Sequence, residues 1–175
     1  MGKNSGKKIL FVINPKAGSR PKRDYLSEIS EASKRYNFRH FIYETRGERD
    51  DIEVRRIIGE FKPEIIVTLG GDGTVNLVAR EITGKDIALG IIPAGSANGL
   101  AYNLDIPDDF EQALDLIFSS SPGKMDAINI NDKYMCLHLS DIGINARIVK
   151  RFEEEGSKGL IGYGKQLFKE LFAEK

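Results

Sequence analysis

The stretch IIVTLGGDGT, residues 65–74, joins a short apolar run directly to a loop rich in glycine. An apolar run of this length that stops at turn residues is typical of a strand buried on both faces. Gly70, Gly71 and Gly73 follow at once, and glycine lets the backbone approach a phosphate closely. With apolar residues at helical spacing after the loop, the stretch predicts a strand, a tight turn and a helix over residues 75–82.

Similar runs repeat on both sides of this stretch. Asp50-Asp51 and Asp108-Asp109 each precede apolar residues at helical spacing, so we expect these carboxylates to cap two helices. Strand and helix alternate four times, which predicts an α/β fold with a largely parallel sheet covered by helices on both faces. The predicted strands are residues 9–13, 38–45, 65–69 and 87–92, and the predicted helices are residues 25–36, 54–61, 75–82 and 110–118.

The pattern changes after Pro122-Gly123. Residues 125–131 and 134–139 read as two strands joined by a short polar turn, which predicts an antiparallel hairpin at the C-terminal end of the fold. We interpret residues 1–140 as one α/β domain and residues 141–175 as the start of a second domain. The apolar stripe Leu160, Tyr163, Leu167, Leu171 and Phe172 has no partner further along, so we expect the native chain to continue and this stripe to promote homo-oligomers.

Composition narrows the class of protein. Apolar residues make up 41% and charged residues 30% of the chain, a balance that favours a sizeable core over disorder. Basic and acidic residues number 26 each, so no overall positive field would attract nucleic acid. Cys136 is the single cysteine, which excludes an internal disulfide framework. The longest apolar runs fall far short of the roughly 20 residues of a membrane span, and we expect a cytoplasmic protein.

Three of the four predicted strands end in loops of small residues, at residues 14–19, 70–74 and 93–99. Each loop alone could be only a tight turn. Because the carboxyl ends of parallel strands share one edge of a sheet, all three together favour a site for an anionic ligand there. The sequence has no G-x-x-x-x-G-K-[ST] motif of P-loop proteins, and Gly18 stands alone where a dinucleotide-binding fold has G-x-G-x-x-G.

Asp72 lies inside the central glycine loop. A carboxylate in that position repels a phosphate unless a cation lies between them. Asp72 therefore predicts either a Mg²⁺ ion that bridges the carboxylate and the phosphate or a network of residues that orders such a site.

Three motifs together resemble the catalytic domain of diacylglycerol and sphingosine kinases. They are GGDGT at residues 70–74, Asn14-Pro15 with Gly18-Ser19, and PAGSAN at residues 93–98. The resemblance continues through KMD at residues 124–126 and SDIGINA at residues 140–146. GGDGT alone is shared with NAD kinases, whereas its combination with the Gly-Ser-Ala-Asn loop favours the lipid-kinase branch.

This resemblance implies a lipid kinase that transfers the γ-phosphoryl group of ATP to the hydroxyl of a diacylglycerol-like or sphingoid-like lipid. It implies ATP and Mg²⁺ as cofactors, peripheral contact with a membrane, and a β-rich second domain that holds the lipid and the general base. We therefore expect this chain alone to be inactive. Asp72 takes the role of the motif aspartate and shares the metal with Asp126. The implied nucleotide contacts are Asn14, Gly18, Ser19, Thr45, Gly70, Gly71, Asp72, Gly73, Thr74, Val75, Asn76 and Ser96.

Two positions depart from the family pattern. Leu77 stands where the family usually has glutamate, and Gly99 where it often has aspartate, although sphingosine-kinase-like members share that glycine. These positions keep a catalytically silent nucleotide-binding module open as an alternative. The motif shared with NAD kinases keeps an NAD kinase-like enzyme open as another.

Overall fold

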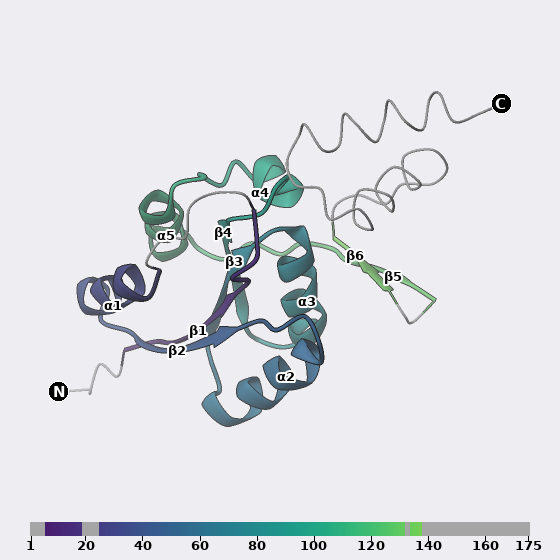
Figure 1. Ribbon diagram of the computed structural model, residues 1–175, viewed down its shortest axis with the longest axis horizontal. Coiled ribbons are helices and arrows are strands. Elements are labelled where there is room, and N and C mark those ends of the chain that lie inside the picture. The colour runs from purple at the N-terminus through teal and green to yellow at the C-terminus, as the bar shows by residue number, and fades with distance from the viewer. Residues whose placement is uncertain (1–5, 19–24, 132–133, 138–175) are drawn as a thin grey trace.

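A computed structural model of the chain describes residues 6–18, 25–131 and 134–137 (Figure 1). Ser19, the predicted second domain and the apolar stripe from Leu160 to Phe172 lie outside the described residues. The proposed division at residue 140 and the self-association of the stripe therefore stay predictions.

The central sheet has four parallel strands in the order β2-β1-β3-β4. They are β1 (Lys8–Ile13), β2 (Arg39–Glu44), β3 (Ile65–Gly70) and β4 (Ala88–Pro93). In register, Ile9 of β1 pairs with Ile65 of β3, which in turn pairs with Ala88 of β4. All four predicted strands and the parallel α/β class are thus confirmed.

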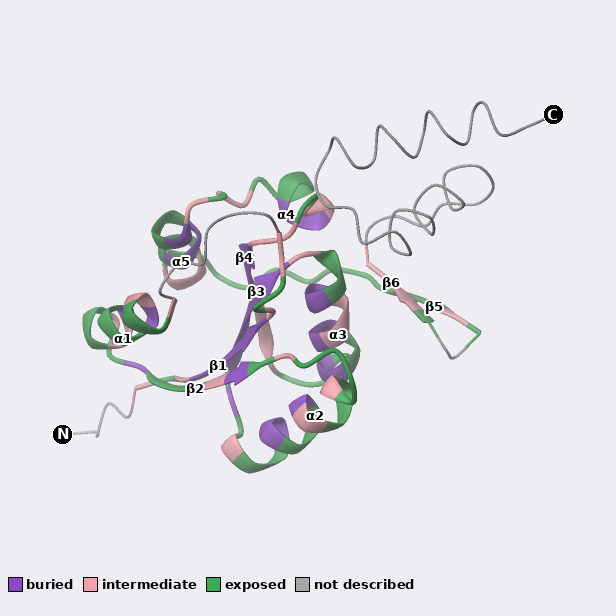
Figure 2. Cartoon of the chain, in the orientation of Figure 1, coloured by how far each residue is buried: buried purple, intermediate pink, exposed green. Residues whose placement is uncertain are grey.

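Side chains alternate between two helical layers, as the period of a strand requires. Ile9 and Phe11 of β1 pack with α1 (Tyr25–Arg35) and α5 (Phe110–Ser119) on one face. Leu10 and Val12 pack with α2 (Asp50–Phe61) and α3 (Asp72–Ile82) on the other (Figure 1). These four side chains of β1 are fully buried, and each such burial contributes about 1.5–3 kcal/mol (Figure 2).

The two pairs of predicted capping aspartates behave differently. Asp109 caps α5 as predicted, accepting hydrogen bonds from the N–H groups of Glu111 and Gln112 at 3.0 and 3.1 Å. The prediction for α2 is wrong, because Arg49 is its N-cap residue and makes no side-chain cap. Asp50 is already the first helical residue, and its carboxylate bonds to the loop before the helix instead.

α3 begins at Asp72, three residues before the predicted start. Thr74 N and Val75 N both donate to the carbonyl of Gly71, at 2.9 and 3.2 Å, so the glycine motif itself forms the first turn. The prediction began later because glycine is a poor helix former in isolation. The short helix α4 (Gly99–Asn103) was not predicted, since five residues are too few to show a helical period.

The predicted hairpin is confirmed in a shorter form. β5 (Ile128–Ile130) and β6 (Tyr134–Cys136) pair antiparallel. Asn76 Nδ2 on α3 donates to the carbonyl of Met135 at 3.0 Å, and Leu137 packs against a small cluster around α4. The hairpin is therefore attached to the helix that follows the glycine motif. None of the helices in the described part of the chain is long and apolar enough to cross a membrane.

Candidate functional site

The loops at the carboxyl ends of the four strands are joined to one another by backbone hydrogen bonds. Thr45 N, after β2, donates to the carbonyl of Ile13 at 2.8 Å, and Asn14 N, after β1, donates to that of Leu69 at 2.8 Å. The rim continues to β4, because Ala94 N donates to the carbonyl of Gly70 at 2.9 Å. The chain turns one way from β1 to β2 and the other way to β3, so this edge contains the switch point where ligands bind in open α/β sheets.

Gly18 brings the β1 loop against the β4 loop. Its φ of +66° is a conformation that favours glycine, and a Cβ at this position would lie 2.4 Å from the carbonyl oxygen of Ala94. Both the backbone conformation and the close approach therefore require glycine. This contact confirms that two of the three predicted loops meet.

The β3 and β4 loops meet through a second pair of glycines. A Cβ on Gly95 would lie 2.4 Å from the Cα of Gly71, so the two backbones touch with no room for a side chain. Asn98, itself at φ +53°, closes the β4 loop by accepting from Gly95 N at 2.8 Å and donating to Gly95 O at 3.1 Å. Asn98 and Gly95 were not assigned a role from sequence. An asparagine in a turn of small residues is the signal that could have found them.

Within the glycine motif, the side chains divide between the core and the rim. Thr74 and Val75 are buried, and the Thr74 side chain fills the space where a Cβ on Gly70 would be, 2.2 Å from its Oγ1. Gly73 is exposed and has nothing within 4 Å of an added Cβ. The Thr74 and Val75 side chains thus belong to the core, and their N–H groups are already bonded to the carbonyl of Gly71. Gly73 leaves an open approach to the start of α3.

Asp72 links α3 to α4. Its two carboxylate oxygens accept from Gly99 N at 2.9 Å and Leu100 N at 3.0 Å, although the residue is exposed. We expected this aspartate as a nucleotide contact and a metal ligand, and the structure adds a clamp between the β3 and β4 loops. The partners lie 27 and 28 residues away, so no local pattern could have revealed them.

A second aspartate organises the turn after β2. Asp50 accepts from the Tyr43 hydroxyl at 2.6 Å and from the N–H groups of Arg46 and Gly47 at 2.9 Å each. Burial and the bond to Asp50 raise the pKa of Tyr43 to about 12. Burial alone would raise the pKa of Asp50, but the hydrogen bonds from Arg46, Tyr43 and Gly47 outweigh it and lower that pKa. The position of Asp50 just before a run of helical spacing suggested a helix cap, and no pattern in the sequence indicated its bonds to the turn.

The other predicted site residues lie at different positions on the rim and beside it. Asn14 turns the β1 loop, accepting from Lys16 N at 3.0 Å through its side chain and from Ala17 N at 3.0 Å through its carbonyl. Ser96 is exposed on the β4 loop, and Thr45 is half-buried after β2. Asn76 lies one turn into α3 and uses its amide on the hairpin, so it is the least suited to contact a ligand at the rim.

Comparison with known proteins identifies the family. The profile of the diacylglycerol kinase catalytic domain matches residues 8–130, more than half of the chain. This chain belongs to that family. The match covers the whole parallel sheet and the first strand of the hairpin.

Relatives of this diacylglycerol kinase-family chain carry lipid-kinase names. A Streptococcus pneumoniae protein named "Putative lipid kinase" is 29% identical over 97% of this chain and 58% of its own length. A Cronobacter sakazakii protein named "Probable lipid kinase YegS-like" is 34% identical over 57% of this chain and 34% of its own length. A solved diacylglycerol kinase from Bacillus anthracis superimposes with a TM-score of 0.52 at 27% identity, over 67% of this chain and 43% of that one. The chain thus spans about half the length of its relatives.

The donor set for the Mg²⁺ predicted in this diacylglycerol kinase-family domain is small. In residues 6–18, 25–131 and 134–137, no group of three or more His, Cys, Asp or Glu side chains comes together. Each Asp72 oxygen keeps a lone pair beyond its bond to α4, and Mg²⁺ is commonly held by one or two carboxylates plus substrate phosphates. Asp72 therefore fits a Mg²⁺ that arrives with a nucleotide. Asp126 is exposed before the hairpin, and its metal role stays a prediction.

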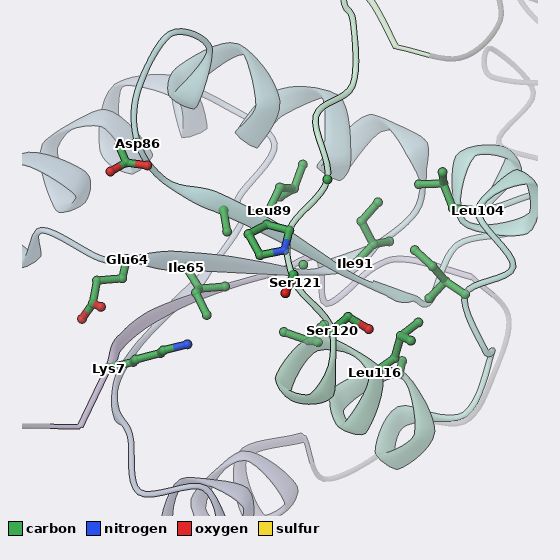
Figure 3. Close-up of a pocket in the computed structure, with 17 residues that line it drawn as sticks. Lys7, Glu64, Ile65, Asp86, Leu89, Ile91, Leu104, Leu116, Ser120 and Ser121 are labelled. Carbon is green, nitrogen blue, oxygen red and sulfur yellow. The ribbon is translucent and has the colours of Figure 1, made fainter. Parts of the chain in front are cut away.

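A cavity of about 480 Å³ lies elsewhere in this diacylglycerol kinase-family domain, between the edge strand β4 and α5 (Figure 3). Apolar side chains such as Leu89, Leu104 and Leu116 line it, together with Ser120 and Ser121. None of its lining residues comes from the three loops at the carboxyl edge. The family motifs therefore lie on the open rim formed by the loops and do not line this cavity.

Proposed function

We propose that this chain is the ATP-binding part of a lipid kinase, which transfers the γ-phosphoryl group of ATP to a lipid hydroxyl. The observation that carries the proposal is the closure of the three motif loops around the start of α3 in a member of the diacylglycerol kinase catalytic domain family. The relatives are named as lipid kinases, which supports a lipid as the acceptor of the phosphoryl group.

The start of α3 supplies the contacts for the phosphates. The first N–H groups of a helix have no carbonyl within the helix to bond, and the helix dipole adds positive potential there. In α3 these are the N–H groups of Asp72 and Gly73, and Gly73 leaves the approach open. The chain therefore presents backbone donors to the phosphates, as glycine-rich nucleotide sites do.

Asp72 orients the site in two ways in this proposal. Its bonds to α4 hold the β4 loop and Ser96 beside the phosphate end. Mg²⁺, when bound with the nucleotide, would neutralise phosphate charge during transfer, with Asp72 and Asp126 as its protein ligands. Positioning and charge stabilisation supply most of the rate in phosphoryl transfer, so a rigid rim is what the reaction requires.

The acceptor lipid and the general base are proposed to belong to the part of the relatives that this chain does not cover. A diacylglycerol-like or sphingoid-like lipid would bring the complete enzyme to a membrane surface as a peripheral protein. On this proposal the chain alone binds ATP without phosphorylating lipid, because an open rim does not exclude water from the phosphates.

The phosphate assignment is tested by Gly73→Val, with Gly59→Val in α2 as the matched control. Both glycines lie in helices with nothing within 4 Å of an added Cβ, so both variants should fold. A side chain at Gly73 fills the approach to the start of α3, and we expect ATP affinity in calorimetric titration to fall at least about tenfold. Unchanged affinity in Gly73→Val would refute the assignment. A loss in Gly59→Val as large as in Gly73→Val would show that the effect is not specific to the site.

A further inference from the structure

We propose that Asp50 is a positioning residue for the nucleotide, because its carboxylate fixes the turn after β2, residues 45–49, as the wall that holds the nucleoside end. The inference rests on the proposed function, since it assumes that ATP lies along the carboxyl edge with its phosphates at α3. Asp50 would then serve the nucleotide site in addition to beginning the helix α2.

Three donors converge on this one carboxylate. Tyr43, which is 8% exposed, donates its hydroxyl to Oδ1 at 2.6 Å. Arg46 N donates to the same oxygen and Gly47 N to Oδ2, each at 2.9 Å. Hydrogen bonds to an ionised group contribute about twice as much as neutral ones. The carboxylate at the start of α2 thus holds Tyr43 near the end of β2 and the N–H groups of Arg46 and Gly47 in the turn.

The turn needs such a support because its backbone is unusual. Gly47 has a φ of +95° and Arg49 a φ of +58°, and a left-handed conformation is unfavourable for a residue with a Cβ. Residues 46–49 are exposed, so packing does not hold them. The bonds to Asp50 are therefore what keeps this exposed turn in one conformation.

The turn lies at the distance from the phosphates that a nucleotide would span. Neighbouring strands are about 4.8 Å apart, and β2 is two strands from β3, which places the turn about 10 Å from the start of α3 along the edge. Thr45, half-buried and tied to Ile13 O at 2.8 Å, brings a hydroxyl donor and acceptor to this place.

The experiment compares Asp50→Ala with Asp51→Ala in the 175-residue chain, using ATP and inorganic triphosphate as separate ligands. Asp51 is exposed in the same first turn of α2, so its replacement removes a similar helix-dipole charge without touching the turn. We expect Asp50→Ala to weaken ATP binding about tenfold while triphosphate binding changes less than about twofold. Asp51→Ala should leave both affinities near those of the wild type.

Equal losses for ATP and triphosphate in Asp50→Ala, or no loss for either, would overturn the inference while leaving the phosphate site intact. Thermal unfolding checks that each variant is folded. If Asp50→Ala does not fold, Tyr43→Phe takes its place, because it removes one of the three donors and keeps the ring. A selective loss of ATP affinity of about twofold to threefold in Tyr43→Phe supports the inference, and no selective loss overturns it. A wild-type chain that binds neither ligand would defeat the proposed function, and this inference with it.

Discussion

Asp72 and Asp50 each occupy the first position of a helix, and each turns its carboxylate toward a neighbouring loop. Asp72 bonds to the start of α4, and Asp50 bonds to the turn before α2. An aspartate in the first turn of a helix is favourable for the helix dipole wherever its oxygens point. The same residue can therefore stabilise its own helix and position a loop of the site.

Replacing Asp72 by alanine should destabilise the fold as well as weaken nucleotide binding. The change leaves the N–H groups of Gly99 and Leu100 without their charged acceptor, and we expect a loss of about 1–2 kcal/mol in the free energy of unfolding. Urea denaturation checks this, with Asp86→Ala as a control, because Asp86 is exposed in the loop before β4. Equal stabilities of the two variants would contradict the clamp.

The Tyr43–Asp50 pair should make stability depend on pH at both extremes. The pKa of Tyr43 is raised, so its contribution is complete below the ordinary value of 10.0 and is lost as pH rises toward about 12. The pKa of Asp50 is lowered, so its contribution is present above the ordinary value of 3.8 and is lost as pH falls through the lowered value.

Tyr43→Phe isolates the alkaline part of this dependence. Because phenylalanine does not ionise, the stability advantage of the wild type over the variant should shrink as pH rises from about 9 to about 11.5. Urea denaturation across that range measures the difference. A stability advantage that stays constant with pH would show that the pKa of Tyr43 is not raised in the folded protein.

At the level of elements, the strands were predictable and the start of the motif helix was not. β1 and β3 are continuous apolar runs stopped by turn residues, and burial on both faces follows from that pattern alone. α3 starts inside GGDGT because the N–H groups of Thr74 and Val75 bond back to the carbonyl of Gly71, and these local bonds form despite the weak helix propensity of glycine. α4 escaped prediction because the bond to Asp72, and not its own sequence period, fixes its start.

The contact between the β1 and β4 loops makes Gly18 a sensitive position. Gly18→Ala would place a methyl group 2.4 Å from Ala94 O and should cost about 1–3 kcal/mol or push the loops apart. Gly84→Ala is the control, since Gly84 also has a positive φ, +76°, but open space around it. A cost for Gly18→Ala no larger than that for Gly84→Ala, in thermal unfolding, would show that the loops are not in firm contact.

At the scale of the molecule, the sheet order decides where the site lies. The order β2-β1-β3-β4 gathers four loops that are far apart in sequence at one edge. The sequence was enough to predict that the glycine loops share this edge, because parallel strands all point the same way. It could not predict the bonds between the loops, since those depend on how each turn closes after the sheet has formed.

If ATP binds at this rim and not in the cavity beside β4, the two places should respond differently to the nucleotide. The most direct measurement is an amide NMR titration of the nitrogen-labelled chain with ATP and Mg²⁺. We expect the largest shifts at Gly18, Gly73 and Gly95, and small shifts at Leu89 and Leu116 in the cavity. Large shifts confined to the cavity residues, with the glycine amides unmoved, would contradict ATP binding at the rim.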